Sequence, residues 1–152
     1  GDQDMSGAGK KRVMLIGRSG SGKTTLCQYL NNEALRYRKT QTVEIVNGAM
    51  IDTPGEYLER RNKQRALLVT SADAELIVLV QDATEQGTMF PPAFTSVFAK
   101  PSVGVVTKCD LAQPEQIERA KKYLEMAGAE KVVATSSMSG KGMPELTELL
   151  EG

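Results

Sequence analysis

Histidine and tryptophan are absent from the 152-residue chain, and cysteine occurs only twice. The lack of histidine excludes a Ser-His-Asp triad, a histidine acid–base catalyst and any His-ligated metal. Cys27 and Cys109 are far apart in the sequence and lack the spacing of metal ligands. We therefore expect no disulfide framework in this protein.

Neither sign of charge is in excess, because 19 Lys and Arg residues balance 19 Asp and Glu residues. This balance argues against a nucleic-acid or membrane-surface partner. No stretch approaches the ~20 apolar residues of a spanning helix, and residues 1–9 lack the apolar core of a signal peptide. We expect a soluble cytoplasmic protein with a flexible leader over residues 1–10 and one domain over residues 11–152.

Short apolar runs alternate with helical patterns along the chain. Buried strands are predicted over residues 11–17, 76–80, 103–106 and 131–135, and helices over residues 23–35, 56–71, 93–99, 114–128 and 144–151. Asn47-Gly48 predicts a hairpin that pairs residues 42–46 with 49–51 antiparallel. The order predicts an α/β fold in a single domain, with a mostly parallel six-stranded sheet, one antiparallel strand and helices on both faces.

Residues 17–24 match the phosphate-loop pattern G-x-x-x-x-G-K-[ST], between an apolar strand and an amphipathic helix. Backbone N–H groups and the helix N-terminus would bind phosphate oxygens. Lys23 would add charge at the β- and γ-phosphates and is a candidate catalytic residue, and Thr24 would bind Mg²⁺. The predicted phosphate-binding residues here are Gly17, Arg18, Ser19, Gly20, Ser21, Gly22, Lys23, Thr24 and Thr25.

Asp52-Thr53-Pro54-Gly55 follows the next predicted strand. Asp52 can hold Mg²⁺ through a water, and Gly55 can bring its N–H group close to a γ-phosphate because it has no side chain. A Pro-Gly pair is equally typical of an ordinary turn. The segment therefore gains its meaning from its place after a strand.

Thr107-Lys108-Cys109-Asp110 closes the strand over residues 103–106. A carboxylate there can accept hydrogen bonds from N1–H and the 2-amino group of guanine, a donor pair that adenine lacks. Ser136-Ser137 follows the last strand, and its N–H groups can meet the guanine O6. Taken alone, the first segment also fits a helix cap and the second an ordinary loop. All four segments follow strands, so they can meet at one rim of the sheet.

In this order the motifs resemble those of small Ras-like P-loop GTPases of the translation-factor-related class, over residues 11–151. The segments GRSGSGKT, KTQ, IDTPGEYLE, VTKCDLA and TSSMSGKG are similar, more closely, to the family of ethanolamine-utilisation protein P and propanediol-utilisation protein V. The resemblance implies GTP and GDP as ligands, Mg²⁺ as cofactor and a setting in bacterial microcompartment metabolism. It also implies a shell protein or pathway enzyme as partner.

The resemblance assigns roles to individual residues. It implies base binding by Thr107, Lys108, Asp110, Ser136 and Ser137, and metal binding by Thr24, Thr40 and Asp52. Thr40 is favoured over Thr42 because the predicted strand begins just after it.

Two positions depart from the family pattern. In the base loop, residues 107–110, Thr107 replaces an Asn that normally bonds this loop to the phosphate loop, which predicts weaker guanine binding. Glu56 replaces a water-orienting Gln; it is a candidate catalytic residue, but its charge would repel a γ-phosphate. We expect a slow, Mg²⁺-dependent GTPase that acts as a switch or accessory factor. An ATP-using phosphotransferase for a small carboxylate and a non-hydrolysing docking module remain alternatives.

Overall fold

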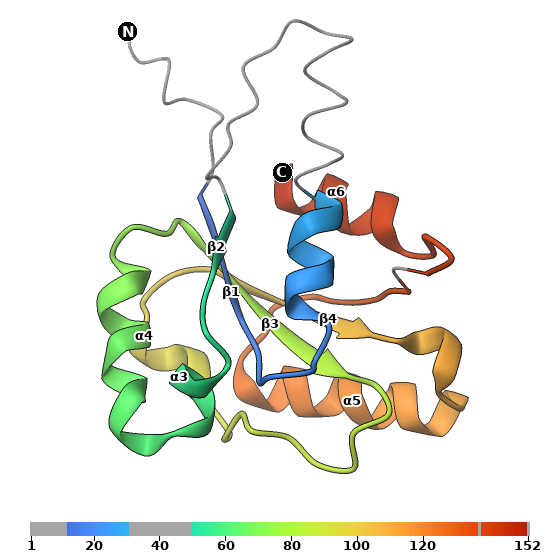
Figure 1. Ribbon diagram of the computed structural model, residues 1–152, viewed down its shortest axis with the longest axis horizontal. Coiled ribbons are helices and arrows are strands. Elements are labelled where there is room, and N and C mark those ends of the chain that lie inside the picture. Colours follow the sequence, from blue (N-terminus) through green and yellow to red (C-terminus); the bar gives the residue numbers. More distant parts are fainter. Residues whose placement is uncertain (1–11, 31–49, 137, 152) are drawn as a thin grey trace, which may run out of the picture.

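Five parallel strands form the centre of the computed structural model, which describes residues 12–30, 50–136 and 138–151 (Figure 1). They are β1 (Val13–Ile16), β2 (Met50–Asp52), β3 (Leu76–Asp82), β4 (Ser102–Thr107) and β5 (Val132–Ala134). Their order across the sheet is β2-β1-β3-β4-β5, and each neighbouring pair is parallel. The predicted α/β class and the parallel core of the sheet are confirmed.

The sheet corrects the prediction in strand number and direction. We predicted six strands with one antiparallel, whereas the described residues form five strands, all parallel. Met50 pairs in parallel register with Val13 of β1. A local hairpin pattern carries no information about this pairing between distant segments. The predicted strand over residues 42–46, its Asn47-Gly48 turn and the leader over residues 1–10 lie outside the described residues.

β3 is longer than predicted and carries polar residues at its end. The apolar run stops at Val80, but Gln81 and Asp82 continue the ladder opposite Val106 and Thr107 of β4. Both polar side chains are buried. Their hydrogen bonds to neighbouring groups, described below, offset the cost of that burial.

The strands are buried on both faces, as expected for a parallel sheet with helices on each side. Alternate residues of β1 belong to two core clusters. Met14 and Ile16 pack in the cluster that contains Leu67 and Leu124, and Val13 and Leu15 pack in the other. The second cluster also contains Leu26, Leu30, Met143 and Leu146, so the helical residues 23–30 and the C-terminal helix cover the second face.

Four labelled helices accompany the sheet: α3 (Glu56–Glu59), α4 (Gln64–Ser71), α5 (Pro114–Ala127) and α6 (Met143–Glu151). Helix α5 begins at Pro114 and ends at the left-handed Gly128, as predicted. Short 3₁₀ turns lie at η1 (Arg61–Lys63), η2 (Phe94–Val97) and η3 (Cys109–Leu111). No helix in these described parts of the chain combines the length and apolar character needed to cross a bilayer.

The helix predicted over residues 56–71 is divided in two. Helix α3 stops at Arg60, whose backbone is extended with φ −110° and ψ 126°, and η1 separates it from α4. Leu58 and Leu67 anchor the two helices in the core, and the charged stretch between them has no apolar face to bury. The helix predicted over residues 93–99 is likewise only the turn η2.

Both cysteines are removed from solvent to different degrees. Cys27 is buried on the helical segment 23–30, and Cys109 is partly buried after β4. Burial raises the pKa of each thiol above its ordinary value. Neither is therefore expected to be a ready nucleophile at neutral pH.

Strand order places a topological switch point between β1 and β3. The chain passes from β1 to β2 on one side and then to β3 on the other. Open α/β sheets bind ligands at the carboxyl ends of the strands at such a point. The phosphate loop follows β1 and residues 83–90 follow β3, so both lie at this edge (Figure 1).

Candidate functional site

The phosphate loop wraps around a cavity at the carboxyl ends of β1 and β2. Gly20 and Gly22 have positive φ values of 82° and 91°, which a residue with a side chain rarely adopts. The cavity has a volume of about 680 Å³, within the range of small-molecule sites. It is lined by phosphate-loop residues between Arg18 and Thr25, by Asp52–Gly55 and by Lys108.

Lys23, Thr24 and Asp52 meet on one wall of this cavity. Lys23 is only 6% exposed, and its Nζ donates hydrogen bonds to Asp52 Oδ1 and to the Thr53 carbonyl. The Thr24 hydroxyl donates to Asp52 Oδ2 at 3.2 Å. The structure thus brings together three of the residues predicted for phosphate and metal binding.

These oxygen donors suit the Mg²⁺ that P-loop proteins use. Thr24 Oγ1 and a carboxylate oxygen of Asp52 are hard ligands on adjacent elements. Mg²⁺ prefers oxygen ligands and is usually held by one or two protein groups, together with waters and phosphate oxygens. Thr40, the third predicted ligand, and its alternative Thr42 lie outside the described residues.

Gly55 lies directly against the phosphate loop. A Cβ at this position would clash with the backbone nitrogen and hydroxyl of Ser19. Thr53, just before it, is anchored by its hydroxyl, which donates to the Leu15 carbonyl of β1 at 2.8 Å. Only glycine fits at position 55, so its N–H group can face the cavity without a side chain in the way.

Thr107 and Lys108 connect the predicted base loop to the phosphate loop. Thr107 is only 3% exposed, and its hydroxyl donates to the Ser21 carbonyl at 2.5 Å. Lys108 Nζ donates to the Gly20 carbonyl at 2.8 Å. Threonine therefore links the two loops at the position where the family pattern has Asn. Weaker guanine binding stays a prediction.

Asp82 is a residue beside the site that the sequence analysis did not single out. It pairs with Lys108 Nζ at 3.0 Å and accepts hydrogen bonds from the Thr84 N–H group and hydroxyl. Burial raises the pKa of Asp82, but these hydrogen bonds outweigh it, so the net pKa is lower than usual. Asp82 ends a strand, as Asp52 does. The rule that an acidic residue at the end of a strand is a candidate site residue therefore identifies Asp82 as well, once β3 is extended by two residues.

Asp110 and Ser136 meet beside the base loop. The Ser136 hydroxyl donates to Asp110 Oδ1 at 2.8 Å, so the last strand helps to orient the carboxylate. The two residues line a separate cavity of about 450 Å³, whereas Lys108 lines the phosphate cavity. Ser137, the remaining predicted base-binding residue, lies outside the described residues.

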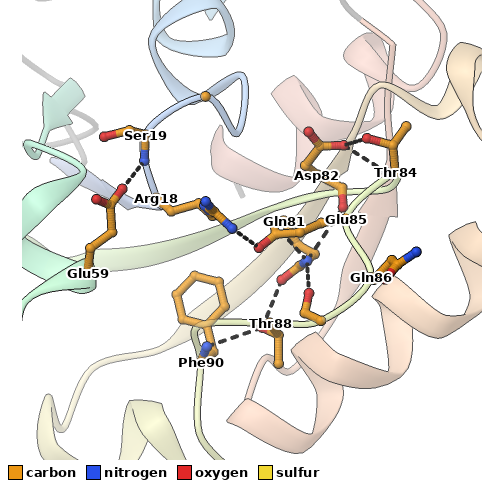
Figure 2. Close-up of polar contacts among 12 residues, drawn as sticks. Arg18, Ser19, Glu59, Gln81, Asp82, Thr84, Glu85, Gln86, Thr88 and Phe90 are labelled. Atoms are coloured by element: carbon orange, nitrogen blue, oxygen red, sulfur yellow. Dashed lines mark hydrogen bonds and ion pairs between the residues drawn. The ribbon is translucent and has the colours of Figure 1, made fainter.

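The first half of the phosphate loop contacts two carboxylates that the sequence did not single out. Arg18 pairs with Glu85 at 2.6 Å, and the Ser19 N–H group donates to Glu59 Oε2 at 2.6 Å. The two carboxylates approach from opposite sides (Figure 2). Hydrogen bonds from Ser19 lower the pKa of Glu59. The hydrogen bond between Arg18 and Glu85 raises the pKa of Arg18.

Glu85 is presented by a loop that several side chains support. Gln81 Nε2 donates to the Gly87 carbonyl at 2.9 Å, and the Thr88 hydroxyl donates to Gln81 Oε1 at 2.8 Å (Figure 2). From α5, the Tyr123 hydroxyl donates to the Gln86 carbonyl at 3.1 Å. The pairing of Arg18 with Glu85 is therefore supported by hydrogen bonds within the loop.

Glu56, the second candidate catalytic residue, is exposed at the start of α3.

The parallel sheet, the phosphate loop after β1 and the linked loop after β4 together define a GTPase-like P-loop protein. The chain belongs to the PduV–EutP family, described as "Ethanolamine utilisation - propanediol utilisation", which matches residues 10–152. The family resemblance inferred from the motifs is confirmed.

Two curated relatives cover most of the chain. The "Propanediol utilization protein PduV" of Citrobacter freundii is 45% identical over 136 residues, 90% of each chain. The "Probable acetate kinase EutP" of Escherichia coli K12 is 29% identical over 141 residues, 92% of this chain and 89% of the relative. The first name gives a metabolic pathway, whereas the second gives an enzymatic activity.

Solved structures agree with the fold. The FeoB G-domain of Methanococcus jannaschii matches with a TM-score of 0.65 and 22% identity, over 92% of this chain and 94% of that one. Elongation factor SelB of Methanococcus maripaludis, solved with a GTP analogue, matches with a TM-score of 0.66 and 22% identity. The match covers 92% of this chain but only 32% of SelB. At this identity the likeness concerns the fold.

Proposed function

We propose that this protein binds GTP and GDP with Mg²⁺, hydrolyses GTP slowly and acts as a nucleotide-dependent switch or accessory factor in ethanolamine or propanediol utilisation. The observation that carries the proposal is the direct bonding of the base loop to the phosphate loop through Thr107 and Lys108. A loop tied in this way holds Asp110 at a fixed distance from bound phosphates. A carboxylate so placed can select guanine through its N1–H and 2-amino donors.

Phosphate binding would use the loop backbone and Lys23. Lys23 would exchange Asp52 for phosphate oxygens, since both offer negative charge to the same ammonium group. Thr24 and Asp52 would hold Mg²⁺, which neutralises charge on the phosphates when bound. Gly55 would offer its N–H group to the γ-phosphate from the opposite wall.

Hydrolysis would be slow because the arrangement lacks a neutral water-orienting side chain at position 56. Glu56 would occupy that place, and its charge opposes a γ-phosphate nearby. Lys23 and the loop N–H groups would still stabilise charge on the transferring phosphoryl group. Fast single-turnover GTP hydrolysis by the isolated protein would contradict this part of the proposal.

A second candidate function is phosphate transfer from ATP to a small carboxylate. The name of the Escherichia coli relative, "Probable acetate kinase EutP", favours it. The same phosphate loop and Mg²⁺ would serve that reaction.

A third candidate function is a docking module that binds nucleotide without hydrolysing it, which would give binding with no turnover. Its partner would be a microcompartment shell protein or a pathway enzyme.

The test is a titration of fluorescent GDP, GTP and ATP analogues, each with and without Mg²⁺. We expect GTP to bind at least about 100-fold more tightly than ATP. Asp110→Asn should shift the preference toward xanthine nucleotides, whereas Asp73→Asn, an exposed control after α4, should not. Tighter ATP binding with acetyl phosphate formed from acetate would favour the kinase instead.

A further inference from the structure

Glu59 makes a contact with the phosphate loop that the proposed function does not use. Its carboxylate accepts the Ser19 N–H group at 2.6 Å, although the two residues are 40 positions apart. Under the proposed function the N–H groups of the loop would bind phosphates, whereas the Ser19 N–H group already has an anionic partner in the protein. Figure 2 shows the carboxylate directed at the Ser19 nitrogen.

Gly55, four residues before Glu59, packs against the same backbone nitrogen of Ser19. A Cβ on Gly55 would clash with Ser19 N, the atom that donates to Glu59. Helix α3 connects the two residues, because the Glu59 N–H group donates to the Gly55 carbonyl at 3.2 Å. The carboxylate and the glycine that faces the γ-phosphate position are thus held together at one point of the loop.

A negative charge fixed there acts on the terminal phosphate more than on the others. The γ-phosphate of a triphosphate would lie in the cavity that Ser19 and Gly55 both line, on the side of the loop that carries Glu59, whereas a diphosphate would leave that place empty. Two like charges ~4 Å apart repel by an amount equal to about a fivefold change in affinity even in water. The repulsion applies only to the nucleotide that carries the third phosphate.

We propose that Glu59 sets the relative affinity for nucleoside diphosphate and triphosphate, by bonding to Ser19 and repelling the γ-phosphate. The proposal rests on the proposed binding of nucleotide at the phosphate loop. Because the effect is reciprocal, a bound triphosphate weakens the bond between Glu59 and Ser19 and so releases α3. Glu59 thereby converts the number of phosphates into the position of a helix.

Substitutions of Glu59 can test this proposal, because the side chain is exposed outside the core and its replacement should not prevent folding. Dissociation constants are measured for GDP and for a non-hydrolysable β,γ-imido GTP analogue with Mg²⁺. The proteins are the wild type, Glu59→Gln, Glu59→Ala and the exposed control Glu125→Gln on α5. Glu59→Gln keeps the size of the side chain and its acceptor oxygen but removes the charge.

We expect Glu59→Gln and Glu59→Ala to bind the triphosphate about fivefold more tightly, with GDP affinity unchanged within about twofold. Glu125→Gln should match the wild type for both nucleotides. An equal shift for both nucleotides, or no shift, would overturn the role of Glu59 while leaving nucleotide binding intact. Failure of the wild type to bind either nucleotide would instead contradict the proposed function.

Discussion

The phosphate end and the base end of the site are built differently. At the phosphate end, Lys23 is buried and bonded to Asp52 and the Thr53 carbonyl inside one cavity. At the base end, Asp110 is exposed and is oriented by one hydroxyl, in a separate cavity. Thr107 and Lys108 connect the two ends through carbonyl groups of the phosphate loop.

This difference indicates how binding energy is divided. Charge in a buried setting acts strongly and cannot be replaced by water, whereas an exposed carboxylate is solvated and acts through the match of its hydrogen bonds. The phosphate end should therefore supply most of the affinity and the base end most of the selectivity. Four substitutions test this division, in order of decreasing effect.

The largest effect is expected from Lys23→Ala. Loss of the charge–phosphate hydrogen bonds should weaken binding of every nucleotide at least about 100-fold, equivalent to ~3 kcal/mol. Isothermal titration calorimetry measures the loss, and Lys122→Ala, an exposed lysine of α5, is the control. If affinity stays within tenfold of the wild type, the phosphate end does not dominate.

Thr24→Ala should act only through the metal. We expect Mg²⁺ to enhance triphosphate binding roughly tenfold less than in the wild type, because one hydroxyl ligand is lost. Binding in EDTA should be unchanged. The measurement is a nucleotide titration at a series of Mg²⁺ concentrations, and an equal loss in EDTA would show that Thr24 contacts phosphate and not metal.

Thr107→Val should separate the two ends. Without the hydroxyl, the Ser21 carbonyl loses its donor, so we expect a stability loss of about 1–2 kcal/mol and about fivefold weaker GTP binding. Pyrophosphate, which has no base, should bind as before.

The control for Thr107→Val is Ser102→Ala at the opposite end of β4, where the Ser102 hydroxyl donates to the Gly128 carbonyl at 3.0 Å. It should lower stability similarly and leave GTP affinity intact. Denaturant unfolding and titration measure both quantities. Equal losses of GTP and pyrophosphate binding in Thr107→Val would contradict a role in placing the base.

The smallest effect is expected from Glu85→Gln. The Arg18–Glu85 pair is partly exposed, with side chains 45% and 17% accessible, so its loss should cost less than about 1 kcal/mol. Nucleotide affinity should change by no more than about twofold. A tenfold change in titration would mean that Arg18 acts on the nucleotide and depends on Glu85 for its position.

Much of the fold and of the phosphate end could be predicted from the sequence because the information is local. An apolar strand, a glycine-rich turn and a helix are contiguous around Lys23, and Pro114 and Gly128 mark the ends of α5. The hairpin signal at Asn47-Gly48 is equally local. It could not reveal that Met50 pairs with Val13 in parallel, which depends on the whole sheet.

Contacts between distant residues could not be predicted. Arg18 and Glu85 are 67 positions apart, and nothing distinguishes Glu59 or Glu85 from the other acidic residues in the sequence. Asp82 is different, because it ends a buried strand as Asp52 does. It was missed because the apolar pattern stops at Val80, whereas the backbone ladder continues to Asp82.

Cys27 is buried and Cys109 partly buried, which makes the native chain suited to site-specific labelling. Thiol-reactive dyes attack the thiolate, and burial raises the pKa of both thiols, which lowers the thiolate fraction of each. A cysteine introduced at the exposed Arg60, just after α3, should react first. An environment-sensitive dye at that site would test whether α3 moves when a triphosphate binds, as the proposal for Glu59 requires, with both native thiols left in place.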